Sequence, residues 1–173
     1  MPVTGTYETV EDRPVVRFER TFPHPVEAVW DAVTDPSRLA RWFPTTVEFE
    51  ALAPGTPIRF EFTRLELPSM SGKVRVVDPR HKLVFTWGED ELAFELQSRD
   101  AGAGCRLRFT VLLGGAERAA RDAAGWDVCL DELEKVAAGG PGTQPGNAPT
   151  EGWRGYYEEY RRRGLPASAP LPE

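Results

Sequence analysis

The stretch at residues 116–138, AERAARDAAGWDVCLDELEKVAA, decides how this chain folds. Its apolar residues recur at the spacing of one stripe of an α-helix, and its charged residues fall on the opposite face. We therefore predict a long amphipathic helix whose stripe packs on a partner and whose charged face lies in water. The stripe comprises Trp126, Cys129, Leu130, Leu133, Val136 and Ala137, and the charged face comprises Glu117, Arg118, Arg121, Asp122, Asp127, Asp131, Glu134 and Lys135.

Gly125 lies in the middle of this helix, beside Trp126. A glycine inside a helix costs roughly 1 kcal/mol relative to alanine. We therefore expect a sheet or a ligand to approach the helix backbone closely at Gly125, or to need room beside Trp126.

The partner that the sequence offers is a β-sheet. From Pro44 to the Gly114-Gly115 pair, apolar and polar residues alternate in short runs that proline and glycine separate. Consecutive strands joined by short turns form an antiparallel meander with one apolar face, which the long helix would cover. The predicted strands are 58–63, 73–77, 83–87, 92–97 and 105–111.

Another strand and two short helices precede this meander. Val16, Phe18 and Phe22 alternate with polar residues, which indicates a half-buried strand within residues 14–22. Pro25 suits the first position of one helix, and Asp35 can cap a second. We interpret residues 1–13 as a loose N-terminal leader or a short edge strand around residues 6–9.

The C-terminal part is divided by composition. Residues 139–149, GGPGTQPGNAP, are typical of a flexible linker. Residues 150–163 then form an amphipathic helix with an aromatic stripe, which would dock on the domain or on a second copy. The predicted division is therefore a leader at 1–13, one domain at 14–138, a linker at 139–149, and a helix with its tail at 150–173. The stripe consists of Trp153, Tyr156, Tyr157 and Tyr160.

Composition excludes several partners. A chain of 173 residues with 40% hydrophobic content can bury one full core. A net charge of −6 argues against nucleic acid or an anionic membrane as the main partner. No membrane-length apolar run and no signal peptide are present, so we expect no membrane span and a cytoplasmic protein, as a monomer or homodimer. Cys105 and Cys129 are expected to be buried thiols rather than a disulfide.

Taken in order, these elements resemble the START-like (SRPBCC) helix-grip superfamily, and within it the family related to the C-terminal domain of the Hsp90 ATPase activator. The resemblance implies an α+β fold in which a curved antiparallel sheet wraps round a long C-terminal helix, with two short helices after the first strand. Members include ligand carriers, cyclases, hormone receptors and co-chaperones, so the fold alone does not fix the function. The residues that carry the resemblance are 29–36 (VWDAVTDP), 41–43 (RWF), 72–79 (GKVRVVDP), 83–87 (LVFTW) and 124–130 (AGWDVCL).

Signals of enzymatic chemistry are mostly absent. His24 and His81 fall in predicted loops, and the His and Cys spacing suggests no metal site. The Gly114-Gly115 pair lacks the P-loop lysine, and no serine has a nucleophile context. We therefore predict no catalytic residue, no metal and no cofactor.

The aromatic residues are the remaining functional signal. In a helix-grip fold they would line an apolar cavity between sheet and helix, although the same side chains could instead fill the space as an ordinary core. Arg20 shares the phase of Phe18 and Phe22, so it would point inward and need a carboxylate partner or an acidic ligand. The predicted ligand-binding residues are Trp42, Phe43, Phe60, Phe85, Trp87, Phe94, Trp126, Leu130 and Arg20.

Three functions compete on this basis. The first is a binding domain that encloses a hydrophobic small molecule such as a lipid or a polyketide-like ring compound. The second is an enzyme resembling polyketide cyclases, which needs an acid or base within reach of the pocket. The third is partner binding resembling the Hsp90 activator, with a bacterial Hsp90 homologue as the partner.

Overall fold

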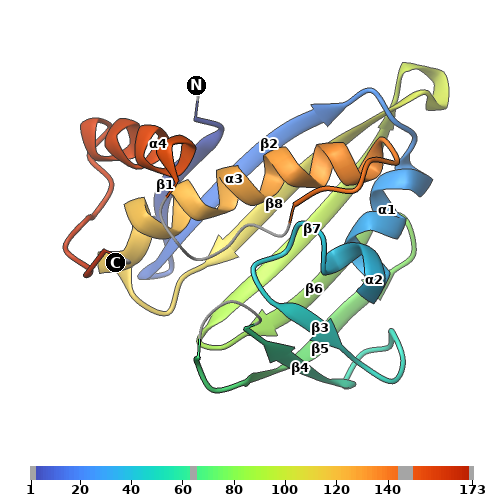
Figure 1. Cartoon of the computed structure of the whole chain (residues 1–173), viewed down its shortest axis with the longest axis horizontal. Helices are drawn as coiled ribbons and strands as arrows, with labels where there is room; N and C mark the ends of the chain where they lie inside the picture. The colour runs from blue at the N-terminus through green and yellow to red at the C-terminus, as the bar shows by residue number, and fades with distance from the viewer. Residues whose placement is uncertain (1–2, 63–65, 144–149, 172–173) are drawn as a thin grey trace.

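The computed structural model describes residues 3–62, 66–143 and 150–171, and it has one sheet with a long helix lying across it (Figure 1). The sheet has eight strands in the order β1-β2-β8-β7-β6-β5-β4-β3, and each neighbouring pair is antiparallel. The predicted α+β helix-grip fold is therefore confirmed. The strands are β1 (Gly5–Val10), β2 (Arg13–Phe22), β3 (Thr46–Glu48), β4 (Pro57–Glu61), β5 (Met70–Asp78), β6 (Lys82–Trp87), β7 (Asp90–Arg99) and β8 (Gly104–Leu112). The helices are α1 (Val26–Thr34), α2 (Pro36–Leu39), α3 (Ala119–Ala137) and α4 (Glu151–Arg162), with 3-10 turns at Asp100–Gly102 and Ala116–Arg118.

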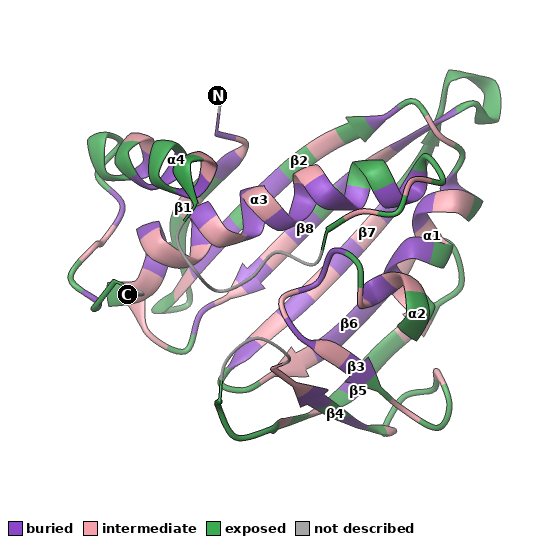
Figure 2. Ribbon diagram, in the orientation of Figure 1, coloured by how far each residue is buried: buried purple, intermediate pink, exposed green. Residues whose placement is uncertain are grey.

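The apolar stripe of α3 faces the sheet. All six of its predicted residues are buried, and Figure 2 shows the buried bands of α3 and of the strands beneath it. Burying apolar surface contributes roughly 25 cal/mol per Å², so this contact stabilises the fold. No helix in the described parts of the chain is long and apolar enough to cross a membrane.

The charged face of α3 differs from the prediction. Asp127 was expected in water, but it is 0% exposed. The reason is α4, which lies along α3 and covers this side of it (Figure 1). The helix thus has two buried faces, one against the sheet and one against α4.

The C-terminal helix docks on its own domain. Its first turn is capped by Thr150, whose hydroxyl accepts a hydrogen bond from the Trp153 amide at 3.1 Å. The chain then returns to the start of α3, where the amide of Ala120 donates to the carbonyl of Pro166 at 2.9 Å. The four aromatic residues of the predicted stripe, Trp153, Tyr156, Tyr157 and Tyr160, are all buried.

Several local predictions can also be compared with the structure. Residues 5–10 form an edge strand paired with β2, which is the second of the two interpretations given for the N-terminus. Asp35 caps α2 by accepting from the amide of Ser37 at 2.9 Å. The short strand β3 was not predicted. The division into leader, domain, linker and tail stays a prediction, and residues 144–149 of the predicted linker lie outside the described residues.

Gly125 does not mark a close approach of the sheet. A Cβ atom added there would meet Nε1 of Trp153, on α4, at 3.9 Å, which is an ordinary contact.

Cys105 and Cys129 are free and buried, as the sequence predicted. Burial raises the pKa of Cys105 to about 11, which disfavours the reactive thiolate form.

Candidate ligand site beneath the long helix

Phe43 is the centre of an aromatic cluster between the sheet and α3. Its ring centroid lies 5.5 Å from that of Trp126 and 5.9 Å from that of Trp87. The turn after α2 supplies Phe43, the end of β6 supplies Trp87, and α3 supplies Trp126. The cluster also contains Trp42, Phe60, Phe85 and Phe94, joined through ring pairs that extend to Phe109.

The structure thus brings together all seven aromatic residues of the predicted site. Leu130 is buried one turn along α3 from Trp126. Phe109 was missing from the predicted set, although its alternation in β8 was visible in the sequence. Its ring lies 4.6 Å from Phe94 and 5.1 Å from Trp126. Whether these rings contact a ligand stays a prediction.

Polar atoms beside the cluster are of two kinds. The indole N–H of Trp42 donates to the carbonyl of Ala32 at 2.7 Å. By contrast, Nε1 of Trp87, Oγ1 of Thr45 and Oδ2 of Asp90 are buried and have no hydrogen-bond partner in the described structure. Native proteins pair the great majority of their buried polar atoms, so these exceptions require an explanation.

The three unpartnered atoms lie toward one end of the sheet. Trp87 ends β6, and Asp90 begins β7 directly opposite it. Thr45 precedes β3, whose first residue pairs with the last residue of β4, at the same end. We call this end, defined by Thr45, Trp87 and Asp90, the Trp87 end.

Asp90 is held in place by one of its two oxygens. Oδ1 accepts from the amide of Gly114 at 2.8 Å and from Nη2 of Arg118 at 2.7 Å. Arg118 also pairs with Asp122 at 3.0 Å. Burial raises the pKa of Asp122, although Arg121 and Arg118 oppose that shift. The Gly114-Gly115 segment therefore connects the last strand to α3 and also orients the Asp90 carboxylate.

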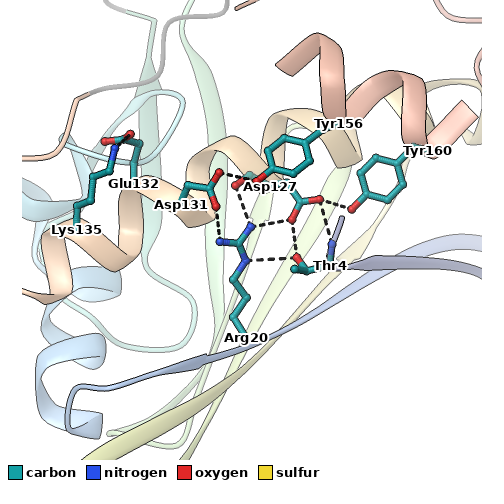
Figure 3. A network of polar contacts seen from close by, with 8 residues as sticks. All are labelled: Thr4, Arg20, Asp127, Asp131, Glu132, Lys135, Tyr156 and Tyr160. Atoms are coloured by element: carbon teal, nitrogen blue, oxygen red, sulfur yellow. Dashed lines mark hydrogen bonds and ion pairs between the residues drawn. The ribbon is translucent and has the colours of Figure 1, made fainter. Parts of the chain in front are cut away.

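Arg20 belongs to a separate polar group on the other side of α3 (Figure 3). Its side chain is only 10% exposed and bonds to Asp131 at 2.6 Å and to Asp127 at 2.8 Å. Its inward orientation and its carboxylate partners agree with the sequence argument. Because two carboxylates of the protein already bind this guanidinium, the structure does not offer it to an acidic ligand.

Two tyrosines of α4 complete this group, which we call the Arg20 network. Tyr156 donates to Asp131 at 2.7 Å, and Tyr160 donates to Asp127. The hydroxyl of Tyr160 also accepts from the amide of Gly5 at 2.8 Å, and Thr4 donates to Asp127. The network therefore joins the N-terminal segment, β2, α3 and α4.

Other parts of the described chain add no further candidate site. An open groove of about 460 Å³ lies at the C-terminal end of α3, but its Glu132 already binds Lys135 at 2.7 Å and the Thr143 amide at 2.8 Å. Among the described residues, no group of three His, Cys, Asp or Glu side chains could hold a metal. His24 is half-buried and His81 exposed, and neither lies in the aromatic cluster.

Comparison with known proteins agrees with this architecture. A conserved protein of unknown function, EF2215 from Enterococcus faecalis, is 21% identical with a TM-score of 0.71, over 92% of this chain and 89% of that chain. CalU16 from Micromonospora echinospora, solved by NMR, is 22% identical with a TM-score of 0.71, over 96% and 93%. DynU16, from the dynemicin biosynthetic locus, is 27% identical with a TM-score of 0.60, over 73% of this chain and 48% of that chain.

No curated protein matches the chain in sequence. The family model described as "Activator of Hsp90 ATPase homolog 1-like protein" matches residues 23–138, from the end of β2 to the end of α3. This match covers more than half of the chain and includes all the aromatic residues of the cluster. The chain therefore belongs to the activator of Hsp90 ATPase homologue 1-like family, within the START-like superfamily.

Proposed function

We propose that the protein binds a hydrophobic, ring-containing small molecule between the sheet and α3, at the Trp87 end. The observation that carries this proposal is the pair of unpartnered buried atoms, Trp87 Nε1 and Thr45 Oγ1, beside an otherwise apolar aromatic cluster. Small-molecule sites combine apolar walls with a few polar groups of this kind. An ordinary core would instead pair such groups, as Trp42 does with Ala32.

Family membership and structural neighbours support the same proposal. CalU16 and DynU16 share the fold, and DynU16 is described as a protein of the dynemicin biosynthetic locus. A polyketide-like ring compound is consistent with a wall made of Phe43, Trp87 and Trp126, since aromatic rings pack well by offset stacking or edge-to-face contact.

Titration with the uncharged fluorescent probe N-phenyl-1-naphthylamine tests the proposal. We expect saturable binding with increased probe emission. Trp126→Phe should weaken it several-fold, because Trp126 contacts both Phe43 and Trp87. Trp153→Phe is the matched control, because Trp153 packs on α4 against the ring of Tyr157. An absence of binding, or equal losses in the two variants, would contradict the proposal.

A cyclase-like enzyme is the second candidate, because Asp90 supplies a carboxylate oxygen at the Trp87 end. A general base must lie within hydrogen-bond reach of the proton that it removes. Under this alternative, Asp90→Asn would abolish cyclisation of a poly-β-ketone thioester and leave probe binding intact. Unchanged cyclisation in the variant would exclude Asp90 as the base. Binding to an Hsp90 homologue and a cytoplasmic location stay predictions.

A further inference from the structure

Trp87 carries an unpartnered donor and Asp90 an unpartnered acceptor, on neighbouring strands of the sheet. They are direct cross-strand partners at the β6–β7 turn, and such partners share a face of the sheet with Cβ atoms about 4.5–5.5 Å apart. The free indole N–H of Trp87 is a donor, whereas the free Oδ2 of the Asp90 carboxylate, whose Oδ1 binds Arg118, is an acceptor. A single group that both accepts and donates would satisfy both atoms.

Both side chains are fixed before any ligand arrives. Two donors, the Gly114 amide and Arg118, hold Oδ1 of Asp90, and the residue is 3% exposed. The indole of Trp87 packs edge-on against Phe43 at 5.9 Å and against Trp126 at 5.4 Å. Preorganised polar groups of this kind discriminate strongly between ligands, because a ligand that leaves them unpaired incurs their desolvation cost.

We propose, building on the proposed function, that this pair recognises a hydroxyl group on an aromatic ring. The phenolic oxygen accepts from Trp87 Nε1, its proton is donated to Asp90 Oδ2, and the ring packs against Phe43 and Trp126. A ketone or ether would satisfy Trp87 and leave the carboxylate unpaired. A ligand carboxylate would be repelled by Asp90. The ligand class is therefore a flat phenol rather than a simple hydrocarbon or a fatty acid.

Three ligands of one ring size separate the possibilities: naphthalene, 2-methoxynaphthalene and 2-naphthol. Their dissociation constants for the full chain are measured by fluorescence below the pKa of the phenol. We expect 2-naphthol to bind roughly tenfold more tightly than the methyl ether, which accepts but cannot donate. In NMR spectra, the indole N–H signal of Trp87 is identified by its absence in Trp87→Phe. This signal should move downfield when 2-naphthol is added and not when naphthalene is added.

Two variants test the two halves of the pair. Trp87→Phe removes ring contact from both ligands and the hydrogen bond from 2-naphthol alone, so it should weaken 2-naphthol binding roughly tenfold more than naphthalene binding. In Asp90→Asn the amide oxygen must accept from Gly114 and Arg118, which turns the NH2 group toward the ligand. The donor then replaces the acceptor, so the preference should reverse in favour of 2-methoxynaphthalene. Glu89→Gln, at an exposed neighbouring carboxylate, is the matched control and should keep the wild-type preference.

The outcomes separate this inference from the function on which it rests. Equal affinities for the three ligands, or a retained 2-naphthol preference in Asp90→Asn, would overturn the phenol anchor and leave apolar binding in place. If none of the three ligands binds, both proposals are wrong. The shift of the indole N–H signal is measured on the unaltered protein and needs only Trp87→Phe for its assignment, so it tests the phenol anchor even if Asp90→Asn folds poorly.

Discussion

The two faces of α3 handle polar groups in opposite ways. On the α4 side, every side chain of the Arg20 network is bonded to another member (Figure 3). On the sheet side, the Trp87 end keeps a buried donor and a buried acceptor without partners in the described structure. A buried charge is therefore a poor marker of a ligand site in this fold, because its partners can all belong to the protein. The unpaired neutral donor is the more informative group.

The largest effect should come from breaking the Arg20 network. Asp127→Ala removes a fully buried carboxylate that binds Arg20, Tyr160 and Thr4, and leaves a guanidinium that is only 10% exposed with one carboxylate fewer. Loss of one partner of a buried ion pair costs about 3–5 kcal/mol in the free energy of unfolding. Urea denaturation measures this loss. Glu8→Ala breaks the exposed pair with Arg17 and should cost less than about 1 kcal/mol; a similar cost for both variants would contradict the contrast.

Alkaline pH should reduce the contribution of the Arg20 network to the free energy of unfolding. Burial, and then the charge of Asp127, raise the pKa of Tyr160 above its ordinary value of 10.0. Since the folded state favours the neutral phenol, this stabilisation is complete below that value and is lost as the pH rises above it.

Tyr160→Phe isolates this contribution. It should cost about 1–2 kcal/mol near neutral pH and make the free energy of unfolding fall less steeply above about pH 10. Tyr157→Phe, whose ring stacks on Trp153 outside the network, is the control. An unchanged slope in Tyr160→Phe would show that this hydroxyl does not control the alkaline transition.

A smaller difference in stability is expected between substitutions of Trp42 and of Trp87, two tryptophans of the aromatic cluster. Trp42→Phe leaves the Ala32 carbonyl without its bond of 2.7 Å, whereas Trp87→Phe removes a donor that has no partner in the described structure. Both variants lose ring volume, and Trp42 is fully buried whereas Trp87 is only partly buried, so the difference between them contains the hydrogen bond and a greater loss of packing. We expect Trp42→Phe to be about 1–2 kcal/mol more destabilising, as measured by thermal unfolding. Equal losses would mean that the Trp87 N–H is satisfied in solution.

The smallest expected change is a gain in stability. Gly125→Ala adds a Cβ atom at an ordinary distance of 3.9 Å from Trp153 and improves helix propensity. The free energy of unfolding should rise by about 0.5–1 kcal/mol. Gly155→Ala in α4, where nothing lies within 4 Å of the new atom, should raise the free energy of unfolding in the same way. A loss of stability in Gly125→Ala alone would indicate that α3 and α4 pack more tightly than the structure shows.

The sequence predicted the fold well because periodicity reports burial directly. The alternation of β7 and the stripe of α3 each describe one face, and both faces are buried as expected. The prediction that Asp127 lies in water was wrong. A helical pattern identifies the main apolar stripe, but it does not identify a second face that is buried by a network of polar side chains. The aromatic residues of the site could be predicted for the same reason as the strands. The free atoms of Trp87 and Asp90 could not, because a hydrogen bond depends on neighbours from distant parts of the chain.

The bond between the Gly5 amide and the Tyr160 hydroxyl spans 155 positions of the chain. During synthesis, the residues of the sheet and of α3 leave the ribosome before those of α4, so Asp127 and Asp131 do not yet have their tyrosine partners. Contacts of such long sequence separation form late, because closing the intervening loop costs entropy. The Arg20 network is therefore expected to be the last part of the domain to acquire its native order, and α4 to act as its closing step.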